Sequence, residues 1–180
     1  MKSNKYLLFI ITILSVFLSG EILAKKAAKM KDTDRETVAF LIAINGDEIA
    51  ISKAVLNRVK NVKVKDFAEM MIKDHTQNLN ETERLGAKEN IVPKKTAALI
   101  EQEKKDNKEK NKLKELKGVA LEKQYMKTMV NGHQKVLNAI DEMIPKTKNK
   151  ALRDHLVSTR KAVAHHLKKA KEVKSSLKLK

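Results

Sequence analysis

Apolar residues recur at steps of three and four over most of this 180-residue chain, and this spacing constrains the fold more than any other feature. Such a period places one apolar stripe along one face of an α-helix. The chain contains only five Gly and two Pro, so few residues interrupt the pattern. No segment shows the strict alternation that is typical of a half-buried strand. We therefore predict an all-α fold.

Four long segments carry the helical pattern, at about residues 38–59, 64–89, 118–144 and 148–177. The short connections "NVKV" at 61–64 and "PKT" at 145–147 make neighbouring segments antiparallel. Residues 94–117 are largely polar and form either an exposed helix or an irregular crossover. We predict a four-helix bundle over residues 36–177, built from two antiparallel hairpins that this crossover joins. No internal repeat at a fixed period is evident.

The N-terminus has the pattern of a secretory signal peptide. Lys2 and Lys5 precede an apolar run at 7–18, and Ala24 supplies a small residue for cleavage. We predict a signal peptide over 1–24 and a flexible lead-in over 25–35. An uncleaved membrane anchor is the alternative, although the run is short for a bilayer. The mature chain is expected in the periplasm or cell envelope, without a transmembrane helix.

The chain is strongly basic. Its net charge is +17, of which residues 1–24 contribute +1, so +16 remains after cleavage. This charge favours anionic cell-envelope polymers or lipid head groups as partners, or it serves solubility alone. Nucleic acid is not expected as a partner, because export separates the protein from it. Aromatic residues, on which bases stack, also make up only 3% of the chain. Cysteine is absent, which excludes disulfides and thiolate sites.

Several polar residues fall within the predicted apolar stripes. They are Asn45, Glu48 and Ser52 in the first segment, and His75, His133 and His166 in the other three. Such groups need partners when they are buried. In one interpretation, Glu48, His75, His133 and His166 bind a transition metal such as zinc, iron or copper. In the other, each histidine forms a hydrogen bond to a neighbouring helix and has a purely structural role.

Helical rise predicts which of these residues lie level with one another. Glu48 and His75 lie roughly 18 and 21 Å from a reversal at 60–61, so we predict that they form a pair. If the second reversal lies at Lys146, the distances of His133 and His166 from it along the helix axis differ by roughly 10 Å. A cluster of all four residues therefore requires a shifted or kinked last helix.

No motif indicates a conventional enzyme. Di-iron carboxylate bundles use Glu-x-x-His, and no histidine here follows that pattern. The residues three positions before the five histidines are Ile72, Val130, Leu152, Ala162 and Val163. The chain also lacks a cysteine nucleophile and a glycine-rich phosphate loop. His165 points about 100° away from His166, so we expect it at the surface.

The chain resembles a bacterial family called domain of unknown function 4142. The residues that carry the resemblance are "GDEIAISKAVLNRVKNVKVKDFAEMMIKDHTQNLNE", "LEKQYMKTMVNGHQKVL" and "HHLKKA", within about 36–173. This sequence departs from the family pattern at Leu121, where an aromatic residue is expected, and lacks the proline usual before the last histidine. The resemblance implies a ferritin-like four-helix fold and an exported protein, and it implies no activity.

We predict an exported envelope protein that binds a metal ion or small ligand in its core and acts in envelope stress or metal handling. The alternative is a non-enzymatic structural or adaptor protein. Its basic surface would bind anionic envelope polymers, and its histidines would only stabilise the helix register.

Overall fold

The computed structural model describes the backbone of residues 7–177 and the side chains of residues 32–177. Within this range the chain forms five α-helices and no strand, which confirms the all-α prediction. The helices are α1 (Leu7–Leu56), α2 (Val62–Lys88), α3 (Ala97–Glu115), α4 (Gly118–Met143) and α5 (Lys150–Ser176). Residues 1–6 of the predicted signal peptide lie outside the described residues.

Helix α3 occupies the predicted crossover, so the structure has one helix more than the four that we expected. The Thr96 hydroxyl caps its start by accepting a hydrogen bond from the Leu99 amide at 3.1 Å. Only Leu99 and Leu113 are buried among its residues, because the polar run between them provides no apolar stripe. The helix packs on α1 and α4.

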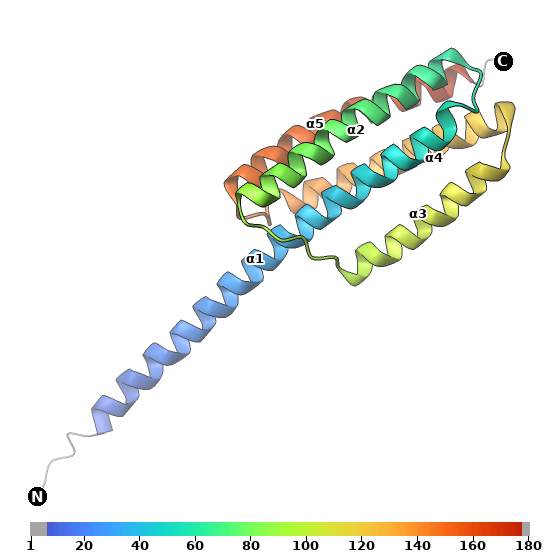
Figure 1. Cartoon of the computed structure of the whole chain (residues 1–180). Helices are drawn as coiled ribbons and strands as arrows, with labels where there is room; N and C mark the ends of the chain where they lie inside the picture. Colours follow the sequence, from blue (N-terminus) through green and yellow to red (C-terminus); the bar gives the residue numbers. More distant parts are fainter. Residues whose placement is uncertain (1–6, 178–180) are drawn as a thin grey trace, which may run out of the picture.

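Helices α1 and α2 run antiparallel to each other, as do α4 and α5, and α2 also packs on α5 (Figure 1). The N-terminal part of α1 extends beyond the other helices as a continuous rod (Figure 1). Residues 25–35, the predicted lead-in, are part of α1. No helix in the described part of the chain is both long and apolar enough to cross a membrane.

The helix starts follow the local sequence closely. Asn61 and Asn149 cap α2 and α5, and each side-chain oxygen accepts a hydrogen bond from a backbone amide of the first turn. Gly118 begins α4 with a φ of 53°, in the left-handed region that glycine adopts without strain. In the first turn of α4, Val119 is 60% exposed and Leu121 is buried.

The two hairpins are related by a shift of 88 residues. Glu122, near the start of α4, accepts hydrogen bonds from the backbone amides of Lys60 and Asn61 at the first reversal. Asp34, 88 residues earlier, accepts from the amides of Lys148 and Asn149 at the second reversal. Each hairpin thus closes the turn of the other. We found no internal repeat in the sequence alone, although Lys60 and Lys148, and Asn61 and Asn149, are identical pairs at this shift.

A polar layer divides the core into two apolar clusters. One cluster contains Phe67, Met71 and Tyr125, and the other contains Leu41, Ile140 and Leu156. Three buried histidines lie between the two clusters along α2, α4 and α5. The fold therefore places titratable rings in the middle of the helix bundle, between the two apolar clusters, where water is excluded.

Candidate metal centre

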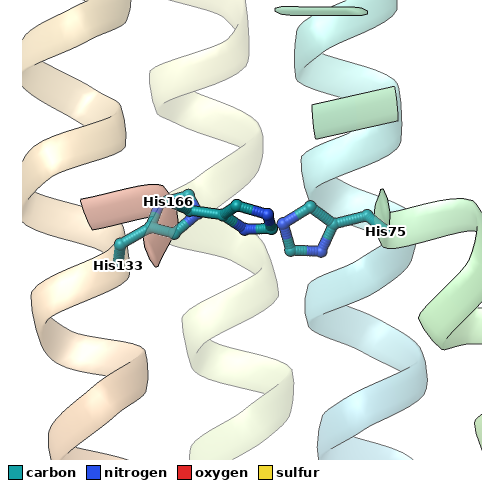
Figure 2. Close-up of side chains that lie close together, drawn as sticks. All are labelled: His75, His133 and His166. Carbon is teal, nitrogen blue, oxygen red and sulfur yellow. The ribbon is translucent and has the colours of Figure 1, made fainter. Parts of the chain in front are cut away.

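The polar layer brings His75, His133 and His166 together from three helices (Figure 2). The side chains are 5%, 2% and 2% exposed. Their ring centroids lie between 5.2 and 5.9 Å apart. One potential ligand nitrogen from each ring lies within 4.8 Å of those from the other two. The three predicted histidines thus form one compact group, which we call the histidine triad.

The triad forms without a shift or kink of α5, because the second reversal lies later than Lys146. Hydrogen bonds of helical type continue beyond α4, and the Thr147 amide still donates to the Met143 carbonyl at 2.9 Å. Residues 147–149 then connect this turn to α5, which Asn149 caps. His133 precedes Asn149 by 16 residues and His166 follows it by 17, which makes them level. The predicted mismatch of roughly 10 Å is therefore wrong.

Asn45 determines which nitrogen of His75 carries the proton. Its amide group donates to the Leu41 carbonyl at 2.7 Å and to Asn78 Oδ1 at 2.8 Å, so its own Oδ1 is an acceptor. This oxygen lies 2.8 Å from His75 Nδ1, which must therefore be the donor. His75 Nε2 is left with a lone pair, and it has no hydrogen-bond partner among the described residues.

The other two imidazoles are oriented in the same way by acceptors. His133 Nδ1 donates to the Met129 carbonyl at 2.9 Å, and His166 Nε2 donates to the Asp74 carboxylate at 3.0 Å. His133 Nε2 and His166 Nδ1 consequently carry lone pairs, and both are buried without a partner in the described structure. Each histidine thus turns its protonated nitrogen outward and keeps one nitrogen free.

The surroundings keep two of the rings neutral. Burial, together with the neighbouring His166 and His133 rings, lowers the pKa of His75 to about 2. Burial also lowers the pKa of His166, to about 4, and the hydrogen bond to Asp74 opposes this shift. Both rings are therefore neutral at pH 7, which is the form that binds metals.

Glu48 occupies a different place from the one that we predicted. No hydrogen bond joins it to His75 in the described structure. Its Oε1 lies 3.9 Å from His133 Nδ1, the nitrogen that points away from the triad. Burial raises the pKa of the carboxyl group, and its Oε2 is buried without a hydrogen-bond partner among the described residues. Glu48 thus lies behind His133, outside the group of potential ligand atoms.

Two triad partners were missed in the sequence. Asp74 directly precedes His75 in the sequence, but its helical position turns it toward α5 and His166. Asn78 donates to Thr159 Oγ1 at 2.9 Å and supports Asn45. In the sequence, the only available signal of such a partner was a polar residue adjacent to a histidine of the apolar stripe. The two other histidines do not join the triad: His165 is exposed, as expected, and His155 contacts Thr82.

A family model matches residues 20–173, a range that includes the whole triad. The chain belongs to the family described as "Domain of unknown function (DUF4142)". This confirms the resemblance that the sequence motifs indicated. Searches of the curated proteins and of the solved structures found no match. The ferritin-like relationship of this DUF4142 chain therefore stays a prediction.

The triad suits a tetrahedral ion after a small contraction. Zinc–imidazole bonds of 2.0–2.1 Å place the ligand nitrogens about 3.4 Å apart. The rings would therefore have to move together by about an ångström, which rotations about their side-chain bonds can provide. Three protein ligands leave one coordination position open, as in zinc sites that accept water or an exogenous ligand.

Proposed function

We propose that this DUF4142 protein is exported and binds one transition-metal ion through His75, His133 and His166. The observation that carries the proposal is the shared orientation of the three rings. Each has its outer nitrogen engaged by a hydrogen-bond acceptor, and each keeps a buried nitrogen lone pair near the other two. A single cation would satisfy all three lone pairs at once.

A purely structural role explains this arrangement less well. A buried nitrogen acceptor without a donor costs free energy, and three such atoms side by side give no compensating bond. The outer partners, by contrast, match the usual support of metal-bound histidine, in which the second ring nitrogen donates to a carboxylate or a backbone carbonyl. Asp74 and the Met129 carbonyl are partners of these two kinds.

The donor set indicates the class of metal. Imidazole nitrogens suit zinc, copper, iron and nickel, whereas magnesium, calcium and manganese prefer oxygen ligands. The triad contributes nitrogen alone, and Glu48 lies outside it. We therefore propose zinc or copper(II) as the most stable occupants, with iron(II) weaker by the general order of affinities. The open position supports a role in metal handling in the envelope.

The test is metal analysis of protein recovered from the envelope fraction of cells that express the full chain without a histidine tag. We expect one equivalent of metal per chain and a melting temperature that rises with zinc or copper(II) and much less with manganese. His75→Gln should lose both effects. His165→Gln is the matched control, since it removes an exposed histidine, and it should keep both.

Two results would contradict the proposal. The first is a folded wild-type protein that takes up no metal in titration with these ions. The second is a His75→Gln variant that binds metal as tightly as wild type. Export is checked on the same sample, because mass spectrometry should show a chain that begins at Lys25.

A further inference from the structure

One end of the molecule combines exposed apolar side chains with free positive charge. At this end α1 finishes, α2 begins, α3 finishes and α4 begins (Figure 1). Val62 and Val119 lie at the starts of α2 and α4 and are 68% and 60% exposed. We call residues 58–66 and 114–123 together the basic tip.

The two valines belong to one surface because Glu122 joins the segments that carry them. Its Oε1 accepts hydrogen bonds from the backbone amides of Lys60 and Asn61 at 2.9 and 2.8 Å. Asn61 precedes Val62 directly, and Val119 lies one helical turn before Glu122. Arg58 also donates to three carbonyls at the end of α3, those of Leu113, Lys114 and Leu116. The tip is therefore a preformed surface.

The charge of this surface is mostly uncompensated. The basic tip contains seven Lys or Arg residues and three Asp or Glu residues. One of the acidic residues, Glu122, is buried and occupied by backbone amides. Lys60, Lys63, Lys117 and Lys123 flank the valines, are exposed, and form no ion pair within the described structure.

The opposite end of the molecule offers a natural comparison. Val92 is 66% exposed there and also has lysines nearby. Lys94, however, pairs with Asp32 at 2.9 Å, and Lys95 pairs with Glu103 at 2.6 Å. An exposed valine is therefore not unusual in this protein. At the basic tip, by contrast, the lysines that flank the two exposed valines have no carboxylate partner among the described residues.

We propose that the basic tip docks on the surface of an anionic phospholipid bilayer. The lysines contact lipid phosphates, and Val62 and Val119 enter the boundary between head groups and acyl chains. A hydrophilic anionic polymer would satisfy the lysines equally well but would leave the valines in water. The exposed valines thus favour lipid over polymer. This inference does not depend on metal binding.

Vesicle binding tests the proposal on the protein recovered from the envelope fraction. We expect it to cosediment with phosphatidylcholine vesicles that contain phosphatidylglycerol, and not with phosphatidylcholine alone. Each lysine at such a surface contributes about fivefold in binding, so Lys60→Gln with Lys117→Gln should weaken it about 25-fold. Val62→Ser with Val119→Ser should weaken it about tenfold.

Matched variants at the other end control for general effects of charge and hydrophobicity. Val92→Ser, and Lys94→Gln with Lys95→Gln, should bind vesicles as wild type does. All of these side chains are exposed, and unchanged circular dichroism would verify folding. The proposal is wrong if wild type does not bind anionic vesicles, or if the valine pair can be replaced without effect. If the valine pair can be replaced without effect, and wild type and the valine variant bind soluble polyphosphate equally, the basic tip is a polymer-binding surface instead.

Discussion

His166 Nε2 donates a hydrogen bond to Asp74 Oδ2 across 3.0 Å, and this contact joins α5 to α2. It determines that the free nitrogen of His166 is Nδ1, which is buried without a partner in the described part of the chain. Asp74 is partly exposed and His166 is not, so the contact also links the triad to the surface of the protein. A carboxylate in this position makes the imidazole a stronger metal ligand.

Replacing Asp74 should therefore weaken metal binding without removing a ligand. For Asp74→Ala we expect zinc affinity to fall about 10- to 100-fold, the usual effect of losing such a partner. Competition with a chromophoric chelator measures this affinity. Asp154→Ala is the control, because Asp154 forms only an exposed pair with Lys150, and it should leave the affinity unchanged. Equal affinities for the two variants would exclude a supporting role for Asp74.

The metal-free protein should lose stability as the pH falls below 6.5. In the unfolded chain His75 and His166 take up protons near that pH, whereas in the folded protein burial lowers their pKa values to about 2 and about 4. The unfolded state therefore binds more protons, and the free energy of unfolding decreases by about 1.4 kcal/mol per pH unit for each histidine. The contribution of His166 ends near pH 4, and that of His75 continues below it.

Urea denaturation at about pH 6.5 and pH 5, with a chelator present, measures this slope. Glu48, whose pKa is raised by burial, gives a slope of opposite sign in this range, so the histidine contribution is read from the difference between variants. His75→Gln should show a shallower dependence than wild type, and His165→Gln should not. Equal slopes for wild type and His75→Gln would mean that the His75 ring becomes protonated while the protein stays folded.

Glu48→Gln should preserve metal binding. The carboxyl group lies beside the outer nitrogen of His133, outside the group of potential ligand atoms, although we had predicted from the sequence that Glu48 is a ligand. Burial raises the pKa of Glu48, so its charged form disfavours the folded state as the pH rises above 4.5. The metal-free variant should therefore be at least as stable as wild type at pH 7. Metal analysis and thermal melts check both outcomes, and a lost equivalent of metal would make Glu48 a ligand.

The two carboxylates that close the reversals should matter for stability and not for metal stoichiometry. Glu122→Ala and Asp34→Ala each remove an acceptor from two backbone amides. We expect each change to cost about 2–3 kcal/mol, measured by chemical denaturation, because the amides lose charged partners. Glu142→Ala removes a highly exposed carboxylate and should cost little. A loss confined to metal binding would contradict this assignment.

Much of the secondary structure could be predicted from local pattern. The starts of α2, α4 and α5 lie within about two residues of the expected positions, since Asn61, Gly118 and Asn149 act on their own first turns. The polar segment at 94–117 could not be assigned, because an exposed helix without an apolar stripe has no periodic signal. Leu113, near its end, packs in one core cluster with Val55, which lies far away in the sequence.

The sequence by itself determined that His75, His133 and His166 face the core, because a helical period defines the angle of each side chain about its own axis. It did not determine their heights or their partners. Whether His133 meets His166 depends on how far the chain rises before Asn149, and whether His75 binds Glu48 or Asn45 depends on how α1 and α2 pack. These are relations between separate helices, and only the tertiary structure decides them.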